Sequence, residues 1–160
     1  MDEESFHAFY EQTARNLRAY LRSMLIDQNA VDDLLQESYF RFLKAGLPAA
    51  TEPAHQKNYL YRIATNLTHD HRRSHKLEVL PEELPAASKA NSLDQVHDIG
   101  RALDRLRPRD RDALWLAYVE CFNHREIAGI LQVGAASIRP MLARARAKFA
   151  EILRRLDLNE

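Results

Sequence analysis

Cysteine is almost absent from this chain, since Cys121 is its only one among 160 residues. A single cysteine excludes an internal disulfide and suits a reducing cytoplasm, so we expect Cys121 to be a small buried apolar residue. Glycine and proline are also few, at four and six residues, which favours long helices over many-turned β folds. No apolar run approaches the length of a membrane span, and the acidic start MDEESF excludes a signal peptide. These absences predict a helical cytoplasmic protein without membrane insertion.

Net charge is absent as well, because 23 lysines and arginines balance 23 aspartates and glutamates. The charges are nevertheless unevenly distributed. Residues 61–76 hold four cations against one acid, and residues 136–156 hold six cations against one acid. Local basic stripes, rather than the charge of a whole chain, determine affinity for nucleic acid. The zero net charge therefore does not exclude DNA binding.

Hydrophobic periodicity divides the chain into two groups of helices. Apolar residues recur at helical spacing over residues 6–25, from Asn29 to near Gly46, and over residues 57–75, which predicts three amphipathic helices packed as a bundle. A proline-containing segment without periodicity follows, and then further helices. The sequence predicts an all-α fold of two small helical domains, 1–76 and 93–160, joined by a flexible linker, 77–92. No further domain is expected after residue 160.

The second predicted helix has an unusual outer face. Its inner face includes Phe42 and Leu43, while Asp33, Glu37 and Phe40 share the opposite side. A large exposed apolar residue among acids indicates a partner surface. An ordinary solvated face is the alternative, and the residues alone leave both open.

The third predicted helix combines cations, hydrogen-bonding side chains and an aromatic ring on the face opposite its apolar stripe. Such a face suits a nucleic-acid backbone and unstacked bases. A solvated face with stabilising ion pairs is the alternative, but Asp70 is the only acid nearby in sequence. The predicted outer-face residues are Tyr61, Arg62, Thr65, Asn66, His69, Arg72 and Arg73.

A histidine cluster in the same helix raises the question of a metal site. His71 and His75 are four residues apart, a spacing that can hold a metal ion. However, His71 falls on the apolar face, and no second cluster completes a site. The sequence also lacks a phosphate-binding glycine loop and a nucleophile–base arrangement. We therefore expect no metal, no cofactor and no catalytic residue.

Residues 123–149, NHREIAGILQVGAASIRPMLARARAKF, have a pattern typical of a helix, a tight turn and a second, arginine-rich helix. Asn123 followed by Glu126 predicts a capping box at the start of the first. In a helix-turn-helix the second helix enters the major groove, and its basic side chains bind phosphates. A packing hairpin with a solvated basic face is the alternative. The predicted exposed set is Ser137, Arg139, Met141, Arg144, Arg146 and Lys148.

Pro140 leaves two structures open for the start of this last helix. If Ser137 caps the helix, Pro140 lies in the first turn, where backbone N–H groups have no partner and a proline is harmless. If the helix starts at Ala135 or Ala136, Pro140 removes one backbone hydrogen bond, and the first turn should loosen or bend.

Four segments of the chain together resemble the hallmark segments of extracytoplasmic-function sigma factors, the small two-domain promoter-specificity subunits of bacterial RNA polymerase. They occur in the family's order over about residues 5–155. The family often has glycine where Cys121 stands. The segments are VDDLLQESYFRFLK, NYLYRIATNLTHDHRRS, ALDRLRPRDRDALWLAYVE and REIAGILQVGAASIRPMLARARAKF.

The resemblance implies a docking role for the first segment and a promoter role for the second. The second would handle the −10 element, with Asn58 joining the outer-face residues of the third helix, and the loop Leu47–Lys57 would help form a pocket for a flipped base. The first would bind the β′ clamp helices of core RNA polymerase. Its implied docking residues are Asp32, Asp33, Gln36, Glu37 and Phe40.

The last segment would read the −35 element in duplex DNA, with Arg125 joining the exposed set of the last helix. The partners implied by the resemblance are core RNA polymerase, at its β′ clamp helices and β flap, and promoter DNA. An anti-sigma protein is a candidate additional partner.

Three other functions are alternatives to a promoter-specificity subunit. A conventional transcription regulator with a signal-sensing N-terminal half explains the helix-turn-helix but neither the basic third helix nor the acidic second one. A sigma-like decoy that only binds an anti-sigma protein is expected to have lost its basic stripes, and both are present. Only the histidine cluster would support an enzymatic function.

Overall fold

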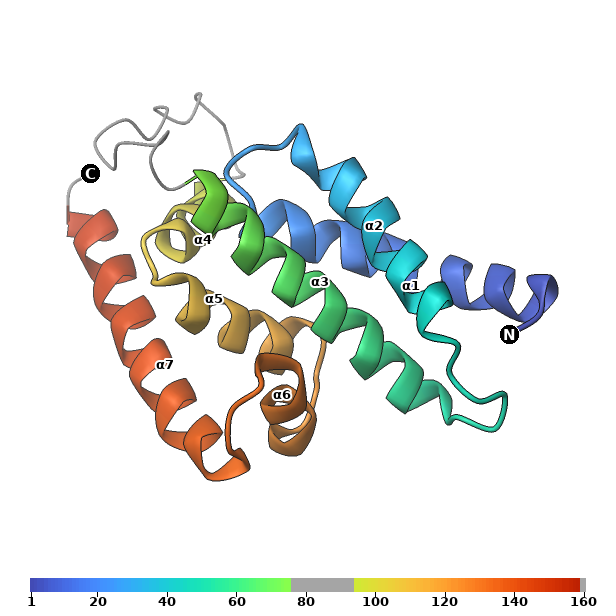
Figure 1. Ribbon diagram of the computed structural model, residues 1–160. Coiled ribbons are helices and arrows are strands. Elements are labelled where there is room, and N and C mark those ends of the chain that lie inside the picture. The colour runs from blue at the N-terminus through green and yellow to red at the C-terminus, as the bar shows by residue number, and fades with distance from the viewer. Residues whose placement is uncertain (76–93, 159–160) are drawn as a thin grey trace.

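The computed structural model describes residues 1–75 and 94–158, in which every regular element is helical (Figure 1). The predicted all-α fold class is confirmed, while the predicted linker, 77–92, lies outside the described residues. None of the described helices is both long and apolar enough to cross a membrane. The elements are α1 (Glu3–Met24), α2 (Ala30–Ala45), α3 (Pro53–His75), α4 (Asp94–Asp104), α5 (Pro108–Leu114), the π-helix η1 (Trp115–Val119), α6 (His124–Leu131) and α7 (Ala135–Leu158).

Helices α1, α2 and α3 pack together as the predicted bundle, but two of them start earlier than predicted. Helix α1 begins at Glu3 because Asp2 caps it, its side chain accepting a hydrogen bond from the Ser5 N–H at 2.7 Å. Helix α3 begins at Pro53, a residue that the sequence predicts to lie in the preceding loop. Proline is favoured at the first position of a helix, because that N–H would lack a partner anyway.

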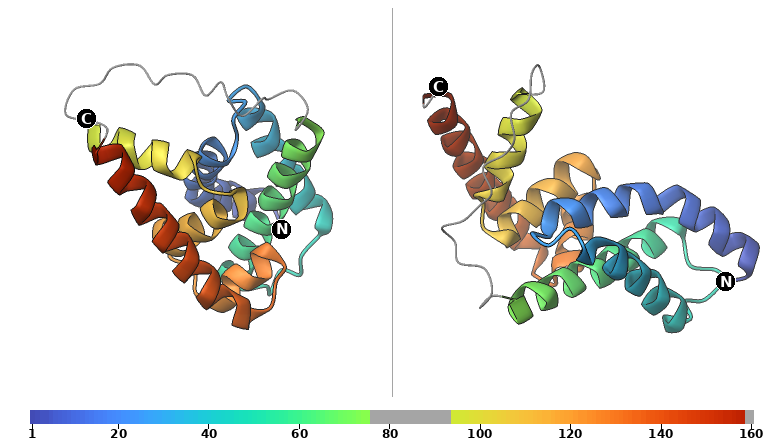
Figure 2. Two further views of the ribbon diagram at one scale, coloured as in Figure 1. Left: turned by 90° about the vertical axis from the view of Figure 1, so that its left-hand side faces the viewer. Right: turned by 90° about the horizontal axis from the view of Figure 1, so that it is seen from above.

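The remaining helices form a second group, called here the C-terminal module (α4–α7). Helix α7 packs against α4, α5 and α6, and the two views of Figure 2 show α4 beside the C-terminal half of α7. Asn123 caps α6 as predicted, accepting from the Glu126 N–H at 2.8 Å while its own amide donates to the Glu126 carboxylate.

The buried apolar residues of both groups form one continuous core. Figure 1 shows α3 lying between α1 and α2 on one side and α5 and α6 on the other. Tyr20 of α1 is fully buried. The centroid of its ring lies 5.4 Å from the ring centroid of Tyr61 and 6.5 Å from that of Trp115. The Tyr61 ring in turn meets Phe122 edge-on at 5.3 Å. Aromatic packing therefore joins α1, α3 and η1 directly.

Cys121 does not occupy a buried position, so that prediction is wrong. It follows η1, is exposed, and has a backbone φ of 59°, in the left-handed region. The backbone leaves the helix here, with the Glu120 N–H donating to the Trp115 carbonyl at 3.1 Å. A left-handed conformation favours glycine, which has no Cβ to clash. This geometry explains why glycine is common at this place in the family that the sequence resembles.

Replacing Cys121 by glycine is expected to raise the free energy of unfolding by about 0.5–1 kcal/mol. A side chain in the left-handed region costs about 1–2 kcal/mol, and the greater flexibility of an unfolded glycine offsets part of the gain. Urea unfolding would measure the change, with Cys121→Ala as the control that keeps the Cβ. Equal stability of the glycine and alanine variants would show that the backbone is not strained there.

Candidate nucleic-acid interface and docking face

The predicted docking residues lie together on the outer side of α2. Asp32, Asp33 and Gln36 are exposed, and Glu37 is half-buried and pairs with Arg41 at 2.8 Å. Phe40 is 59% exposed, whereas its neighbours Tyr39 and Phe42 are 5% and 3% exposed. Leu43, predicted to be buried, is 44% exposed and extends this apolar surface.

A hollow of about 460 Å³ lies where the loop Leu47–Lys57 was predicted to help form a base pocket. The loop residues on its wall are spread along the segment, and the rest of the wall comes from the chain start and the end of α2. The role in base binding stays a prediction. The lining residues are Met1, Asp2, Ser5, Phe42, Leu43, Gly46, Leu47, Pro48, Ala49, Thr51, Pro53 and Gln56.

Part of the α3 face predicted to be open is instead enclosed, by the C-terminal module and by Tyr20 of α1. Tyr61 and Thr65 are both 0% exposed, which contradicts their placement on an outer face. The sequence pattern revealed one apolar stripe on α3, but this helix is packed on two sides, by α1 and α2 and by α6. Half-buried His69 and Arg72 also face the module, while Arg62 and Arg73 are exposed.

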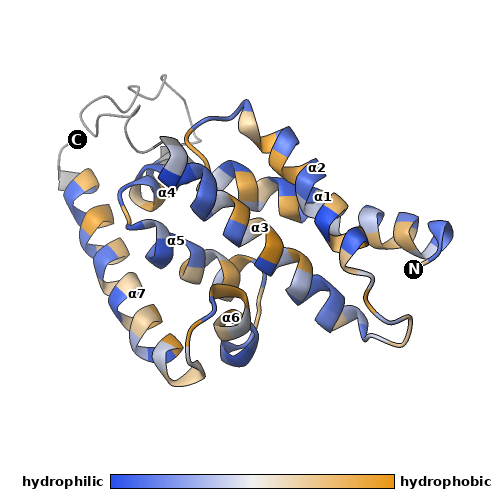
Figure 3. Cartoon of the chain, viewed as in Figure 1, coloured by the Kyte–Doolittle hydropathy of each residue, from blue (hydrophilic) through white to orange (hydrophobic). Residues whose placement is uncertain are grey.

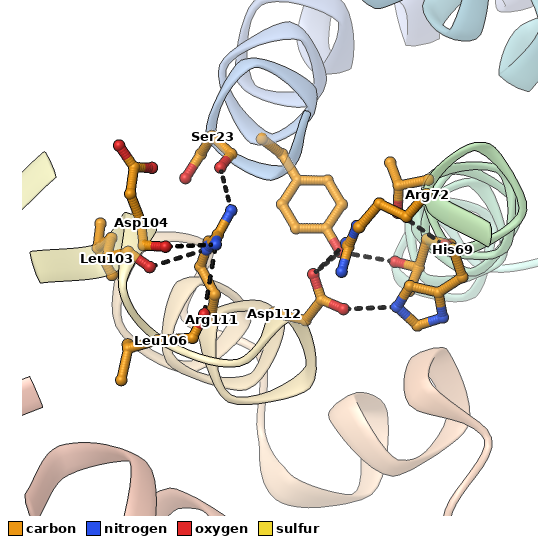
Figure 4. A network of polar contacts seen from close by, with 11 residues as sticks. Ser23, His69, Arg72, Leu103, Asp104, Leu106, Arg111 and Asp112 are labelled. Atoms are coloured by element: carbon orange, nitrogen blue, oxygen red, sulfur yellow. Dashed lines mark hydrogen bonds and ion pairs between the residues drawn. The ribbon is translucent and has the colours of Figure 1, made fainter. Parts of the chain in front are cut away.

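Asp112 of α5 is the centre of the contact, and Figure 4 shows it between the side chains of His69 and Arg72. Its carboxylate lies 2.7 Å from the His69 Nε2 and 3.6 Å from an Arg72 guanidinium nitrogen. The Tyr20 hydroxyl donates to the same carboxylate at 3.3 Å and lies 2.8 Å from the Thr65 hydroxyl. Asp112 is 0% exposed. The acidic partner of His69 is therefore Asp112, which lies 43 residues away in the sequence. The sequence of α3 itself contains no acid other than Asp70 that could fill this role.

Glu120 forms a second buried acidic contact with the same face of α3. The Tyr61 hydroxyl donates to it at 2.7 Å, and the Lys57 ammonium lies 3.6 Å from its other oxygen. The Glu120 side chain is 3% exposed. Burial, and after it the hydrogen bond to the Glu120 carboxylate, raise the pKa of Tyr61 far above its usual value. Tyr61 therefore stays protonated and keeps donating.

Gln132, in the turn of the helix-turn-helix, completes the contact. In the amide orientation that satisfies every partner, it donates to Asn66 at 3.2 Å and accepts from Arg62 at 2.6 and 3.2 Å. Two other predicted −10 residues lie apart from these contacts. Arg73 forms an ion pair with Asp70, and Asn58 has a buried side-chain oxygen without a hydrogen-bond partner.

Helix α7 presents most of its predicted DNA-binding residues to solvent. Hydrophilic and hydrophobic residues alternate along it, as expected for a helix with one buried face (Figure 3). Met141 is 6% exposed and packs in the core, so its predicted place in the exposed set is wrong. Arg146 donates to the Tyr118 hydroxyl at 2.6 Å. The exposed predicted residues are Ser137, Arg139, Arg144, Arg146 and Lys148, with Arg125 on α6.

Of the two starts left open for the last helix, the one at Ala135 is observed. Helix α7 begins at Ala135, so Pro140 lies inside it and its nitrogen cannot donate to the carbonyl four residues earlier. The helix nonetheless runs uninterrupted from Ala135 to Leu158. The exposed end of α7 is therefore a regular helix with one backbone hydrogen bond missing.

Two family models match the chain: Sigma-70 region 2 over residues 9–78, and Sigma-70, region 4 over residues 97–149. The chain is also 26% identical over 155 residues to the ECF RNA polymerase sigma factor SigM of Bacillus subtilis, a match covering 91% of this chain and 93% of that protein. The chain belongs to the extracytoplasmic-function sigma factors. It is a sigma factor that directs transcription initiation, and sigma factors are not a family of enzymes.

Other relatives agree with this sigma-factor assignment. The RNA polymerase sigma factor SigZ of Bacillus subtilis is 26% identical over 149 residues, covering 90% of this chain and 84% of that protein. Among solved structures, the sigma factor RpoE in its complex with the anti-sigma factor NepR from Bartonella quintana shares the fold, with a TM-score of 0.77 and 22% identity over 94% of this chain and 98% of that one. CnrH, solved with the cytosolic domain of CnrY, gives a TM-score of 0.70 and 22% identity over 96% and 90% of the two chains.

Proposed function

We propose that this sigma factor binds core RNA polymerase in the cytoplasm and directs recognition and −10 melting of promoter DNA. The observation that supports it best is where the two family matches fall. The region 2 match contains α2 and α3, which carry the acidic docking face and the predicted −10 residues, and the region 4 match contains α6 and the exposed start of α7. One chain thus pairs a protein-docking face with a duplex-reading helix. An anti-sigma protein stays a candidate partner from the family resemblance alone.

The division of work follows from the chemistry of each face. Exposed Phe40 among the carboxylates of α2 suits a basic protein surface with an apolar pocket, which we assign to the β′ clamp helices. The exposed cations of α7 suit the phosphates of duplex −35 DNA. Arg62 and Asn66 combine a cation with an amide that can pair with base edges, which suits unstacked bases of the −10 strand. The β flap is the proposed contact of the C-terminal module.

Replacing Phe40 by alanine is expected to weaken binding to core polymerase by about 2 kcal/mol, roughly 30-fold, because a large aromatic anchor typically contributes that much at an interface. Run-off transcription with purified core polymerase on genomic DNA tests the function itself and reports the promoter. Titrating each variant in that assay gives its affinity for core polymerase.

The matched control for Phe40→Ala is Ile26→Ala, which truncates another exposed apolar side chain, 61% exposed, outside α2. It should transcribe at wild-type concentrations. No transcript with the wild-type chain would refute the proposed function. Equal titration curves for Phe40→Ala and wild type would refute only the docking face.

A further inference from the structure

We propose that Tyr118 of η1 and Arg146 of α7 together form a phosphate-binding site for duplex DNA. The hydroxyl of Tyr118 and the guanidinium of Arg146 bind the same phosphate group, and the pair is called here the Tyr118–Arg146 clamp. The proposal rests on the proposed function of α7 as the duplex-reading helix. It adds a DNA contact from outside the helix-turn-helix pattern of residues 123–149.

The backbone around η1 directs the Tyr118 side chain away from the core. Leu116 is 0% exposed and the Glu120 side chain is 3% exposed, whereas Tyr118, which lies between them, is 56% exposed. The Glu120 N–H donates to the carbonyl of Trp115, five residues earlier, so this stretch is a π-helical turn. Such turns are rare and frequently occur at functional sites. The exposed ring at this turn is therefore a candidate contact surface and not part of the core.

The hydrogen bond between Tyr118 and Arg146 leaves both side chains able to bind an anion. Arg146 donates to the Tyr118 hydroxyl at 2.6 Å. A guanidinium has donors only, so the hydroxyl accepts in this bond and its own hydrogen can point to a second acceptor. The guanidinium keeps further N–H groups for the same purpose. The pair thus offers O–H and N–H donors to a phosphate, whose oxygens accept hydrogen bonds strongly.

The positive charge of Arg146 is available to a phosphate. Among the residues that the structure describes, 1–75 and 94–158, Arg146 forms no ion pair with a carboxylate, and its partner is a neutral hydroxyl. Lys148, by contrast, lies 3.9 Å from Glu151, so a phosphate must compete with this acid for Lys148. The Arg146 side chain is also held in place before DNA arrives, which reduces the conformational entropy lost on binding.

The place of Arg146 along α7 agrees with a contact to the DNA backbone. Arg146 lies seven residues after Arg139, so the two share one side of the helix and are about 10 Å apart along its axis. The start of a recognition helix lies at the base edges, and the major groove is about 12 Å wide. With Arg139 in the groove, Arg146 lies near the phosphates that border it. Tyr118 reaches the same phosphates because its hydroxyl touches the Arg146 guanidinium.

The test measures binding of the full chain to a fluorescein-labelled pool of random-sequence duplex DNA, by anisotropy at low salt. Tyr118→Phe keeps the ring and removes the hydroxyl. It should weaken binding about tenfold, the size expected for a lost hydrogen bond to a charged group. The slope of log affinity against log salt should stay at the wild-type value, because no cation is removed. The matched control is Tyr10→Phe, at a half-buried tyrosine of α1, which should bind as the wild type does.

A double-mutant cycle decides whether the two side chains bind one phosphate. Arg146→Met should weaken binding about tenfold or more and make the salt slope shallower by about 0.9. Adding Tyr118→Phe to Arg146→Met should then cost less than about threefold, because side chains that share one partner have non-additive effects. The control cycle combines Tyr118→Phe with Arg144→Met, since Arg144 lies on a different side of α7 from Arg146. There the two losses should multiply.

Three outcomes overturn the clamp. The first is equal duplex binding by Tyr118→Phe and the wild type, and the second is losses that multiply when Tyr118→Phe and Arg146→Met are combined. The third is a lower free energy of unfolding of Tyr118→Phe in urea, because an exposed hydroxyl that binds DNA should leave stability unchanged.

Failure of the proposed function has a different signature. A wild-type chain that binds no duplex and yields no run-off transcript refutes the assignment of α7 to DNA, and the clamp with it. Failure of the clamp alone leaves duplex binding and transcription by the wild type intact.

Discussion

Replacing Arg111 by methionine is expected to lower the free energy of unfolding by about 3 kcal/mol or more. Arg111 is 8% exposed, and its guanidinium donates to four backbone carbonyls, as Figure 4 shows. A hydrogen bond from a charged donor contributes about 1.5–3 kcal/mol, and a buried carbonyl left without a donor costs about 1–3 kcal/mol. The four distances are 2.9 Å to Leu103, 3.2 Å to Ser23, 3.2 Å to Asp104 and 3.3 Å to Leu106.

The position of these carbonyls explains why the effect is large. Ser23 lies in the last turn of α1 and Asp104 ends α4, so their carbonyls have no donor within their own helices. The Leu103 carbonyl also accepts from the Leu106 N–H at 3.1 Å. The same ends carry the negative pole of the helix dipole, which favours a cation. Burial lowers the pKa of Arg111 below its usual value, with the charge of Asp104 opposing this effect. Arg111 thus joins α1 to the C-terminal module.

Urea unfolding followed by circular dichroism would measure the loss for Arg111→Met. Arg111→Lys is expected to recover little of it, because an ammonium cannot span four carbonyls as the planar guanidinium does. Arg109→Met removes an exposed arginine from the same helix and should stay within about 0.5 kcal/mol of the wild type. A loss below about 1 kcal/mol for Arg111→Met would contradict the bridging role assigned to it.

The helices themselves could be predicted from the sequence, because they depend on local periodicity and capping. The amphipathic stripes placed Leu17, Leu60 and Ile138 in the core, where all three are 0% exposed. The Asn123 capping box was also readable from residue types alone. The burial of Met141 also follows from helical spacing, since it lies three residues after Ile138 and four before Ala145, both buried.

The contact between the two groups of helices could not be predicted in the same way. Arg111 and Asp112 belong to the charged run PRDRD, which reads as solvated surface unless its distant partners are known. Tyr61 and Thr65 lie off the main apolar stripe of α3. Both contact Tyr20 of α1, and Tyr61 also contacts Glu120 and Phe122, far along the chain. The identity of residue 121 as a cysteine gives no indication that its backbone is left-handed. These three misses concern tertiary partners or a backbone angle, not helix propensity.

Replacing Arg139, Arg144 and Lys148 together by alanine is expected to weaken duplex binding by about 10²- to 10³-fold at low salt. All three are exposed on α7, in the region assigned to phosphate contact. Each phosphate contact releases counterions and contributes about 0.9 to the slope of log affinity against log salt. The slope should therefore become shallower by roughly three units in the triple variant.

The same geometry predicts that the wild-type chain has a weak −35 sequence preference. Ala135, Ala136 and Pro140 lie at the exposed end of α7 and have no hydrogen-bonding side chains, and Met141 is now known to be buried. Direct reading of base edges then rests on Ser137 and Arg139, whereas specific recognition usually combines several such contacts. Backbone contacts position a protein on DNA but carry no sequence information themselves.

Selection from a pool of randomised duplexes, carried out with the full chain at two salt concentrations, measures both properties at once. The control variant replaces Arg101, Arg105 and Arg154, three exposed cations outside the assigned surface, and should keep a salt slope near that of the wild type. If the control loses as much affinity as the α7 variant, binding reflects overall charge and not this helix. A sharp sequence motif with little salt dependence would mean that α7 reads bases through contacts other than those of Ser137 and Arg139.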